Sequence, residues 1–227
     1  AERAARIARA QALMAKAGMA AIVVEPGSSL DYFTGIKWWR SERVTAAIIP
    51  ASGQPVIVTP FFEEPSVRQS LGVQAEVRVW QEDEDPLALV AEALRQAGGA
   101  TSAIGIEETV RFFISDGLAR RLPQARIASA NPVVRACRMV KTATEIALMQ
   151  AASDVTLTAQ RWAWQRIRGG MTPSDIAALI DAATAALGGK ASDGLVLLGE
   201  ASAYPHGSAK PQAVREGEVV LIDCGCS

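Results

Sequence analysis

The chain has 227 residues, of which 49% are hydrophobic, and its 23 basic and 24 acidic residues give a net charge of −1. This length and apolar content suit one large or two modest domains with a real core, which excludes a disordered protein. The balanced charge argues against nucleic acid or an anionic membrane as the main partner, because both need a concentrated basic face. No apolar run approaches the roughly 18 residues of a membrane span.

The three cysteines, Cys137, Cys224 and Cys226, are too few to form a disulfide framework. Their scarcity predicts reduced thiols and a cytoplasmic protein, and it leaves export open. Cys224 and Cys226 form a Cys-x-Cys pair, but a zinc site normally takes four ligands and the sequence has no second pair.

Strands alternate with helices in the first part of the chain. Residues 1–18 have apolar positions at helical spacing and stop at Gly18, which predicts a C-terminal cap. The turn "ASG" between two apolar runs indicates a hairpin. Strands are predicted at 20–25, 44–50, 54–60, 76–80, 102–107 and 125–129, and helices after the turn "PGSS", from about 61, at 86–97 and at 111–121. This order predicts an α/β layer domain with a mixed sheet.

The character of the sequence changes near Asn131, where a linking helix is predicted. Thr142 and Glu145 have the spacing of a capping box, and a long amphipathic helix is predicted to follow. Its apolar positions are Ile146, Met149, Ala152, Val155, Ala159 and Trp162. A second helix is predicted from the N-cap Thr172 to Gly188–Gly189, then strands at 194–199 and 218–223. The predicted domains are therefore 1–131 and 132–227.

Asp223 ends the apolar run "EVVLID", which predicts a carboxylate at the end of a buried strand. A buried carboxylate is costly unless it is hydrogen-bonded, paired or bound to a cation. The alternative is an aspartate that caps the turn "DCG" through its own backbone. The only histidine, His206, lies in the loop "AYPHGS" and is either structural, solvated or a donor to a substrate or metal-bound group.

Two other motifs carry weaker hypotheses. The acidic run Glu82–Asp85 is typical of a solvated, mutually repelling loop rather than a cation site. Trp38 and Trp39 are adjacent in "IKWWRSER" and cannot easily share one buried face. One ring is therefore expected to line a pocket or a subunit contact, or simply to pack on the core.

Several motifs, in this order, resemble the creatinase/prolidase branch of the pita-bread metallopeptidases, the Xaa-Pro dipeptidases and aminopeptidases. They are "LDYFTGIKWWRSER", "AAIIPASGQPVIV", "RMVKTATEIALMQAASDV", "YPHG" and "REGEVVLIDCG". The resemblance implies a creatinase-like N-terminal α/β domain followed by the beginning of a pita-bread domain. It also implies hydrolysis of the peptide bond that precedes proline, and a homodimer.

The same resemblance implies roles for two residues. Asp223 matches the first of five ligands of two divalent metal ions, often manganese, and His206 matches a histidine that contacts the substrate and stabilises the tetrahedral intermediate. Two metals would activate a bridging water and polarise the scissile carbonyl. The companion ligands are expected after Asp223, where the sequence has four residues, so an inactive N-terminal fragment is predicted.

Two alternatives stay open. A creatinase-like hydrolase shares the fold and the histidine but cleaves a C–N bond without metals, and Asp223 favours the peptidase over it. A non-catalytic truncated paralogue would instead act in dimerisation through the "WWRSER" loop.

Overall fold

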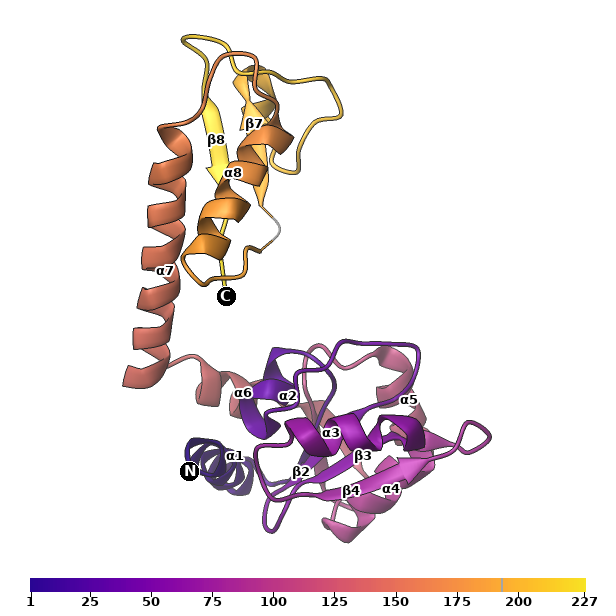
Figure 1. The fold of residues 1–227 in the computed structure, drawn as a ribbon. Helices are drawn as coiled ribbons and strands as arrows, with labels where there is room; N and C mark the ends of the chain where they lie inside the picture. The colour runs from indigo at the N-terminus through magenta and orange to yellow at the C-terminus, as the bar shows by residue number, and fades with distance from the viewer. Residues whose placement is uncertain (193) are drawn as a thin grey trace. The chain divides into compact units, whose positions relative to one another are not determined.

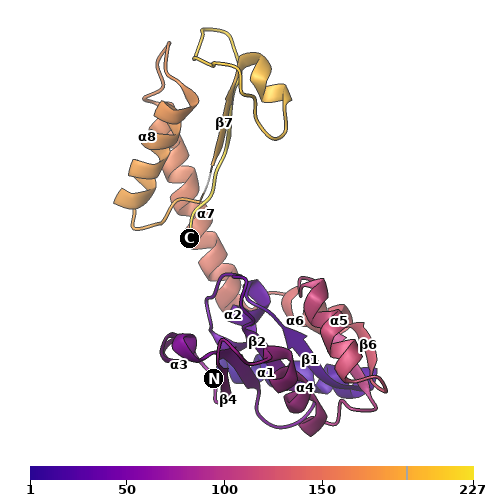
Figure 2. The same ribbon diagram turned by 90° about the vertical axis from the view of Figure 1, so that its right-hand side faces the viewer.

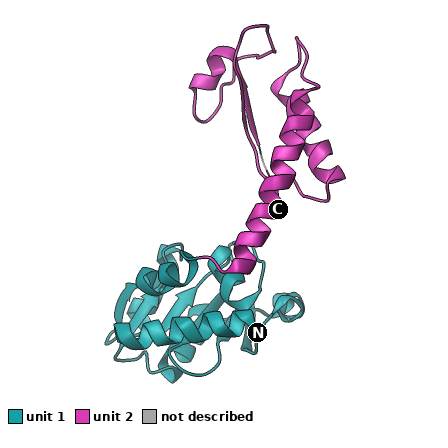
Figure 3. Cartoon of the chain, turned by 90° about the vertical axis from the view of Figure 1, so that its left-hand side faces the viewer, with its two compact units in different colours: residues 1–140 teal, residues 141–227 magenta. Residues whose placement is uncertain are grey.

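The computed structural model describes residues 1–192 and 194–227. The chain divides into two compact units, Ala1–Val140 and Lys141–Ser227 (Figure 3). The division falls after the helix α6 (Asn131–Arg138), whereas the sequence placed it at residue 131. The reason is that Val133, Val134 and Cys137 of α6 are buried in the core of the first unit, so this helix is part of that domain rather than a linker.

The first unit is built on a mixed six-stranded sheet of order β4-β3-β2-β1-β5-β6. β2 runs antiparallel to both of its neighbours, and the other adjacent pairs are parallel. The strands are β1 (Met19–Val24), β2 (Ala46–Pro50), β3 (Val56–Pro60), β4 (Glu76–Trp80), β5 (Ala103–Ile106) and β6 (Arg126–Ser129). The predicted mixed α/β sheet and its hairpin are therefore confirmed, and Gly53 in the hairpin loop has φ 94°.

Helices cover both faces of this sheet because side chains alternate along each strand (Figures 1 and 2). In β1, Ile22 and Val24 join one buried cluster, while Ala21 and Val23 join the other. The first cluster includes residues of α1 (Glu2–Ala17), α2 (Ser28–Thr34), α3 (Glu64–Ser70) and α6, and the second includes α4 (Pro86–Gln96) and α5 (Phe112–Arg121). A 3-10 turn, η1 (Phe61–Glu63), leads into α3.

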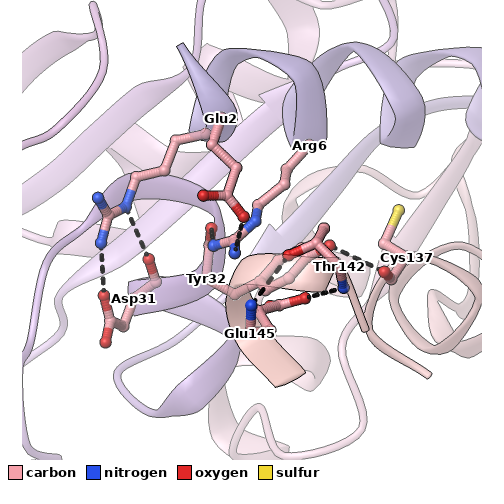
Figure 4. Close-up of polar contacts among 8 residues, drawn as sticks. Glu2, Arg6, Asp31, Tyr32, Cys137, Thr142 and Glu145 are labelled. Carbon is pink, nitrogen blue, oxygen red and sulfur yellow. Dashed lines mark hydrogen bonds and ion pairs between the residues drawn. The ribbon is translucent and has the colours of Figure 1, made fainter. Parts of the chain in front are cut away.

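The second unit contains two helices and a two-stranded antiparallel sheet. These are α7 (Ala143–Trp164), α8 (Pro173–Ala186), β7 (Leu195–Leu198) and β8 (Val220–Asp223), with a 3-10 turn, η2 (Gly199–Ala203), after β7. The predicted capping box of α7 is confirmed: Thr142 Oγ1 accepts from the Glu145 amide at 3.2 Å, and the Glu145 carboxylate accepts from the Thr142 amide at 2.8 Å (Figure 4). α8 begins with an equivalent box between Thr172 and Asp175.

The predicted apolar face of α7 is only partly buried. Ala159 is buried, but Ile146 and Met149 are 58% and 57% exposed. Residues 143–150 are exposed apart from the half-buried Glu145, so the first turns of the helix are largely uncovered. None of the described helices is long and apolar enough to span a membrane.

Candidate functional site

Asp223 is the last residue of β8, and its register partner is Leu195 at the start of β7. It is exposed, so the prediction of a buried strand end is wrong. β7 is the single strand that pairs with β8 in the described part of the chain, and residues Val220–Ile222 are only half-buried. A two-stranded sheet gives the end of β8 no second neighbour to exclude water, which is why the carboxylate is solvated.

The segment after Asp223 is extended rather than turned. The Ser192 amide donates to the Gly225 carbonyl at 3.0 Å, and Lys190 and Ser227 exchange two backbone hydrogen bonds of 2.8 and 2.9 Å. The hypothesis that Asp223 caps a "DCG" turn is therefore wrong. Among the described residues no hydrogen bond or ion pair satisfies its carboxylate, which leaves four acceptor sites for water or a cation.

His206 lies at the third position of a turn from Tyr204 to Gly207. The Gly207 amide donates to the Tyr204 carbonyl at 3.1 Å, Pro205 occupies the second position, and Gly207 has φ 95°, where a side chain is disfavoured. The imidazole is exposed. A methyl group added at Gly207 would lie 3.8 Å from Leu195 Cδ1.

Leu195 therefore connects the two predicted residues. Its side chain lies beneath the turn that carries His206, and its backbone pairs with Asp223 in the sheet. The structure describes no direct contact between the imidazole and the carboxylate. What it brings together is an exposed imidazole and a free carboxylate around one β7 residue, although they are 17 positions apart in sequence (223 − 206).

Gln212 holds the His206 loop against the sheet, and no motif in the sequence singled it out. Its Oε1 accepts from the buried Leu198 amide at 2.9 Å, and its Nε2 donates to the Ser208 carbonyl at 3.3 Å. The side chain thus takes the place of a strand partner at the end of β7 and fixes the backbone two residues after His206. A single glutamine in a polar loop has no pattern that predicts such a contact.

The described residues do not by themselves fit a metal pair. Across residues 1–192 and 194–227 no group of three or more His, Cys, Asp and Glu side chains is placed to hold an ion. Asp223 supplies one carboxylate, and a two-metal site bridges its ions with several. The chemistry that these residues offer on their own is one anionic ligand, with one imidazole on a turn that borders the same β7 residue, Leu195.

Both C-terminal thiols face α7. Cys224 Sγ accepts from Gln160 Nε2 at 3.2 Å, and the Cys226 thiol donates to the Ala152 carbonyl at 3.3 Å. All three cysteines are free, as predicted. The pair is therefore engaged in strand–helix packing rather than facing a shared ligand.

Two carboxylates of the acidic run Glu82–Asp85 pair with arginines, and all four residues are exposed. Glu82 binds the Arg43 guanidinium through 2.8 and 3.0 Å hydrogen bonds, which lower the pKa of that carboxyl. Asp85 caps α4 by accepting from the Leu87 amide at 3.0 Å and also pairs with Arg121. The run is therefore solvated, as predicted, but its repulsion is reduced because Arg43 and Arg121 from other segments neutralise Glu82 and Asp85.

The two adjacent tryptophans separate as predicted. Trp38 is half-buried and packs against the core cluster beneath α1 and α2. Trp39 is 90% exposed. The loop that carries them is fixed by Arg111, which donates to the carbonyls of Ser41 and Arg43 and also binds the buried Glu25 carboxylate.

The chain therefore consists of a mixed α/β domain followed by a second unit that carries an exposed strand-end aspartate and a Pro-His-Gly turn. The creatinase/prolidase N-terminal domain model matches residues 6–140, and the metallopeptidase family M24 model matches residues 147–227. The chain belongs to the creatinase/prolidase family of the M24 metallopeptidases, so the predicted family and the creatinase-like first domain are confirmed.

Named relatives agree with this assignment. The chain is 33% identical over 223 residues to the probable dipeptidase PepE of Mycobacterium tuberculosis, which covers 97% of this chain and 58% of that protein. The crystal structure of dipeptidase PepE from Mycobacterium ulcerans is 32% identical, with a TM-score of 0.84 over 100% of this chain and 61% of that one. A prolidase from Thermococcus sibiricus shares the fold, with a TM-score of 0.83 at 22% identity. The chain thus spans less than two thirds of each of these two PepE proteins.

Proposed function

We propose that this chain is part of a metal-dependent peptidase that cleaves the peptide bond preceding proline in dipeptides or short peptides. The observation that carries the proposal is the free carboxylate of Asp223 at a strand end, bordered by the His206 turn across Leu195, in a chain of the M24 family. In this proposal Lys141–Ser227 forms the first part of a pita-bread domain. Its relatives are named dipeptidases, which favours dipeptides as substrates.

Asp223 is the proposed ligand of one divalent cation, with manganese as the proposed metal. Its exposure means that binding an ion requires no change in burial, and the absence of a described hydrogen-bond partner leaves both oxygens available. The cation would supply Lewis acidity and a more acidic water. His206 is the proposed substrate contact: an exposed imidazole can donate a hydrogen bond to a carbonyl oxygen that becomes negatively charged.

The test is hydrolysis of Gly-Pro and Gly-Ala by the natural protein that carries this chain, with and without added manganese. We expect Gly-Pro to be cleaved in a manganese-dependent manner. His206→Ala should lower kcat by about 100-fold or more, and Asp223→Asn should raise the manganese concentration needed for half activity. Metal-independent cleavage of a C–N bond in a creatine-like substrate would instead support the creatinase-like alternative.

The 227-residue chain by itself allows a second, separate test of the metal site. Because one carboxylate is present where a metal pair needs several, we propose that this chain neither binds manganese tightly nor hydrolyses peptides. Calorimetry with manganese should show weak binding at most. Tight binding of about two ions per chain would contradict this, because it would require ligands that the described residues do not form.

A homodimer that uses the tryptophan loop is the second proposal. It is favoured by Trp39, which at 90% is the most exposed large hydrophobic side chain among the described residues, since aromatic anchors are typical of interfaces. Light scattering should report a dimer, and Trp39→Ala should shift it towards the monomer. An unchanged dimer in this variant would place the interface elsewhere.

A further inference from the structure

A hollow of about 490 Å³ opens in the first unit at the carboxyl ends of β1 and β5. These two strands are adjacent and parallel, while β1 is antiparallel to β2 on its other side. The chain order of the strands reverses here, and in open α/β sheets ligands bind outside the carboxyl ends of strands at such a point. Ligand pockets typically measure roughly 300–1,000 Å³, so the hollow is large enough for a small organic molecule.

The acidic groups that line the hollow are already satisfied. Glu107 is 4% exposed, and its two oxygens accept from the Ser29 hydroxyl at 2.9 Å and from the amide and hydroxyl of Thr109. Glu108 accepts from Asn131 and Arg135. Glu108 is neutralised by Arg135, and the Ser29 hydroxyl bridges the Glu107 carboxylate to the Arg138 guanidinium, so neither carboxylate stands alone in the hollow.

The two arginines that line the hollow have no ion pair with a carboxylate among the described residues. Arg138 is half-buried at the end of α6, and its one described hydrogen bond runs from Nη1 to the Ser29 hydroxyl at 2.8 Å. Its charge helps to lower the pKa of Glu108, after the larger effect of the Arg135 hydrogen bond, yet no ion pair joins Arg138 to a carboxylate in the part of the chain that the structure describes. Arg40, on the facing loop, is exposed and has no described partner either.

A guanidinium with free Nε–H and Nη2–H groups presents the fork that binds a carboxylate or phosphate through two parallel hydrogen bonds. The wall beside it is aromatic: Trp38 is half-buried against the core and therefore held in place, and it lines the same hollow together with Trp39. An indole face favours a flat apolar or heteroaromatic group over an aliphatic one.

We propose that this hollow binds a small anion, a carboxylate or a phosphate, attached to a flat aromatic or heteroaromatic ring. Arg138 binds the anionic group, Arg40 adds a second positive charge, and Trp38 packs against the ring. The site lies wholly within Ala1–Val140, and its lining includes neither Asp223 nor His206. It is therefore independent of the proposed peptidase chemistry.

The test is isothermal titration calorimetry of the 227-residue chain with benzoate and with adenosine monophosphate, at low and at physiological salt. Benzyl alcohol and adenosine are the uncharged counterparts. We expect at least one anion to bind about tenfold or more tightly than its counterpart, with weaker binding at high salt. Binding of benzoate alone identifies a carboxylate site, and binding of adenosine monophosphate alone identifies a phosphate site.

Arg138→Gln should weaken binding about tenfold or more, because a neutral amide replaces the charged fork. Arg40→Gln should weaken it by about two- to fivefold, and since this side chain is exposed without a described partner, the variant should fold normally even if Arg138→Gln does not. Arg120→Gln is the matched control, because Arg120 is a surface arginine outside the lining. The proposal is overturned if neither anion gives a saturable signal, if the uncharged counterparts bind equally well, or if Arg40→Gln and a folded Arg138→Gln bind like the control.

Discussion

Replacing Gln212 with alanine tests whether this side chain fixes the His206 loop. In the structure its Oε1 accepts from the Leu198 amide and its Nε2 donates to the Ser208 carbonyl. Leu198 is 4% exposed and this hydrogen bond is part-buried, so Gln212→Ala leaves the N–H donor without its protein partner. An unsatisfied buried donor costs about 1–3 kcal/mol, which corresponds to a roughly 5- to 150-fold faster local opening.

Amide hydrogen exchange followed by NMR measures this opening at the single peptide group concerned. We expect the Leu198 amide to exchange roughly 5- to 150-fold faster in Gln212→Ala, while amides of the first unit do not change. His206 is the only histidine, so its Cε1 proton gives an unambiguous NMR signal that should also shift as the loop is released.

Gln212→Glu is the matched control: it keeps an acceptor for Leu198 but loses the donor to Ser208. It should preserve most of the Leu198 protection and still disturb the His206 signal. The proposed role of Gln212 in fixing the loop is refuted if the Leu198 amide exchanges at the wild-type rate in Gln212→Ala.

Three further predictions concern stability and reactivity. Arg111→Met should lower the free energy of unfolding of the first unit by about 3–5 kcal/mol in urea titrations, because it leaves the fully buried Glu25 carboxylate unpaired. Acidification should fray the start of α8, because hydrogen bonds from the amide and hydroxyl of Thr172 hold the folded-state pKa of Asp175 below its usual 3.8. That contribution is complete above the unfolded-state pKa and is lost as pH falls through the folded-state value, so Asp175→Asn should abolish this acid-induced loss of amide protection factors at the start of α8. Burial raises the pKa of the Cys137 thiol, so Ellman's reagent at neutral pH should titrate two thiols quickly and the third only after unfolding.

The predictions for Arg111 and for Cys137 have the following controls. Arg120→Met removes only an exposed i,i+4 ion pair and should lower the free energy of unfolding by less than about 0.5 kcal/mol. If Arg111→Met lowered it by no more than this control does, the prediction that the buried Glu25 pair is important would be contradicted. In the double variant Glu25→Leu/Arg111→Met the loss should be smaller than in Arg111→Met alone, since no buried charge is left. Fast labelling of all three thiols in the folded chain would contradict the burial of Cys137.

Local sequence signals determined most of the secondary structure of this protein. Gly18 ends α1 in a left-handed conformation with φ 63°, and the box between Thr142 and Glu145 starts α7, because caps depend on residues only a few positions apart. Alternation of strands and helices likewise predicted the mixed sheet. The motifs around His206 and Asp223 pointed to the family, since they are short and contiguous.

Tertiary structure alone decided which groups are exposed and which are paired. "EVVLID" has the pattern of a buried strand, yet Asp223 is exposed because β8 has one neighbour in the described sheet. In the acidic run at 82–85, Glu82 and Asp85 are neutralised by Arg43 and Arg121, which lie 39 and 36 positions away from them. Burial and ion pairing depend on segments that meet only in the folded chain, whereas a cap or a turn depends on its immediate neighbours, so the sequence predicted the elements and the fold decided the environment of each charge.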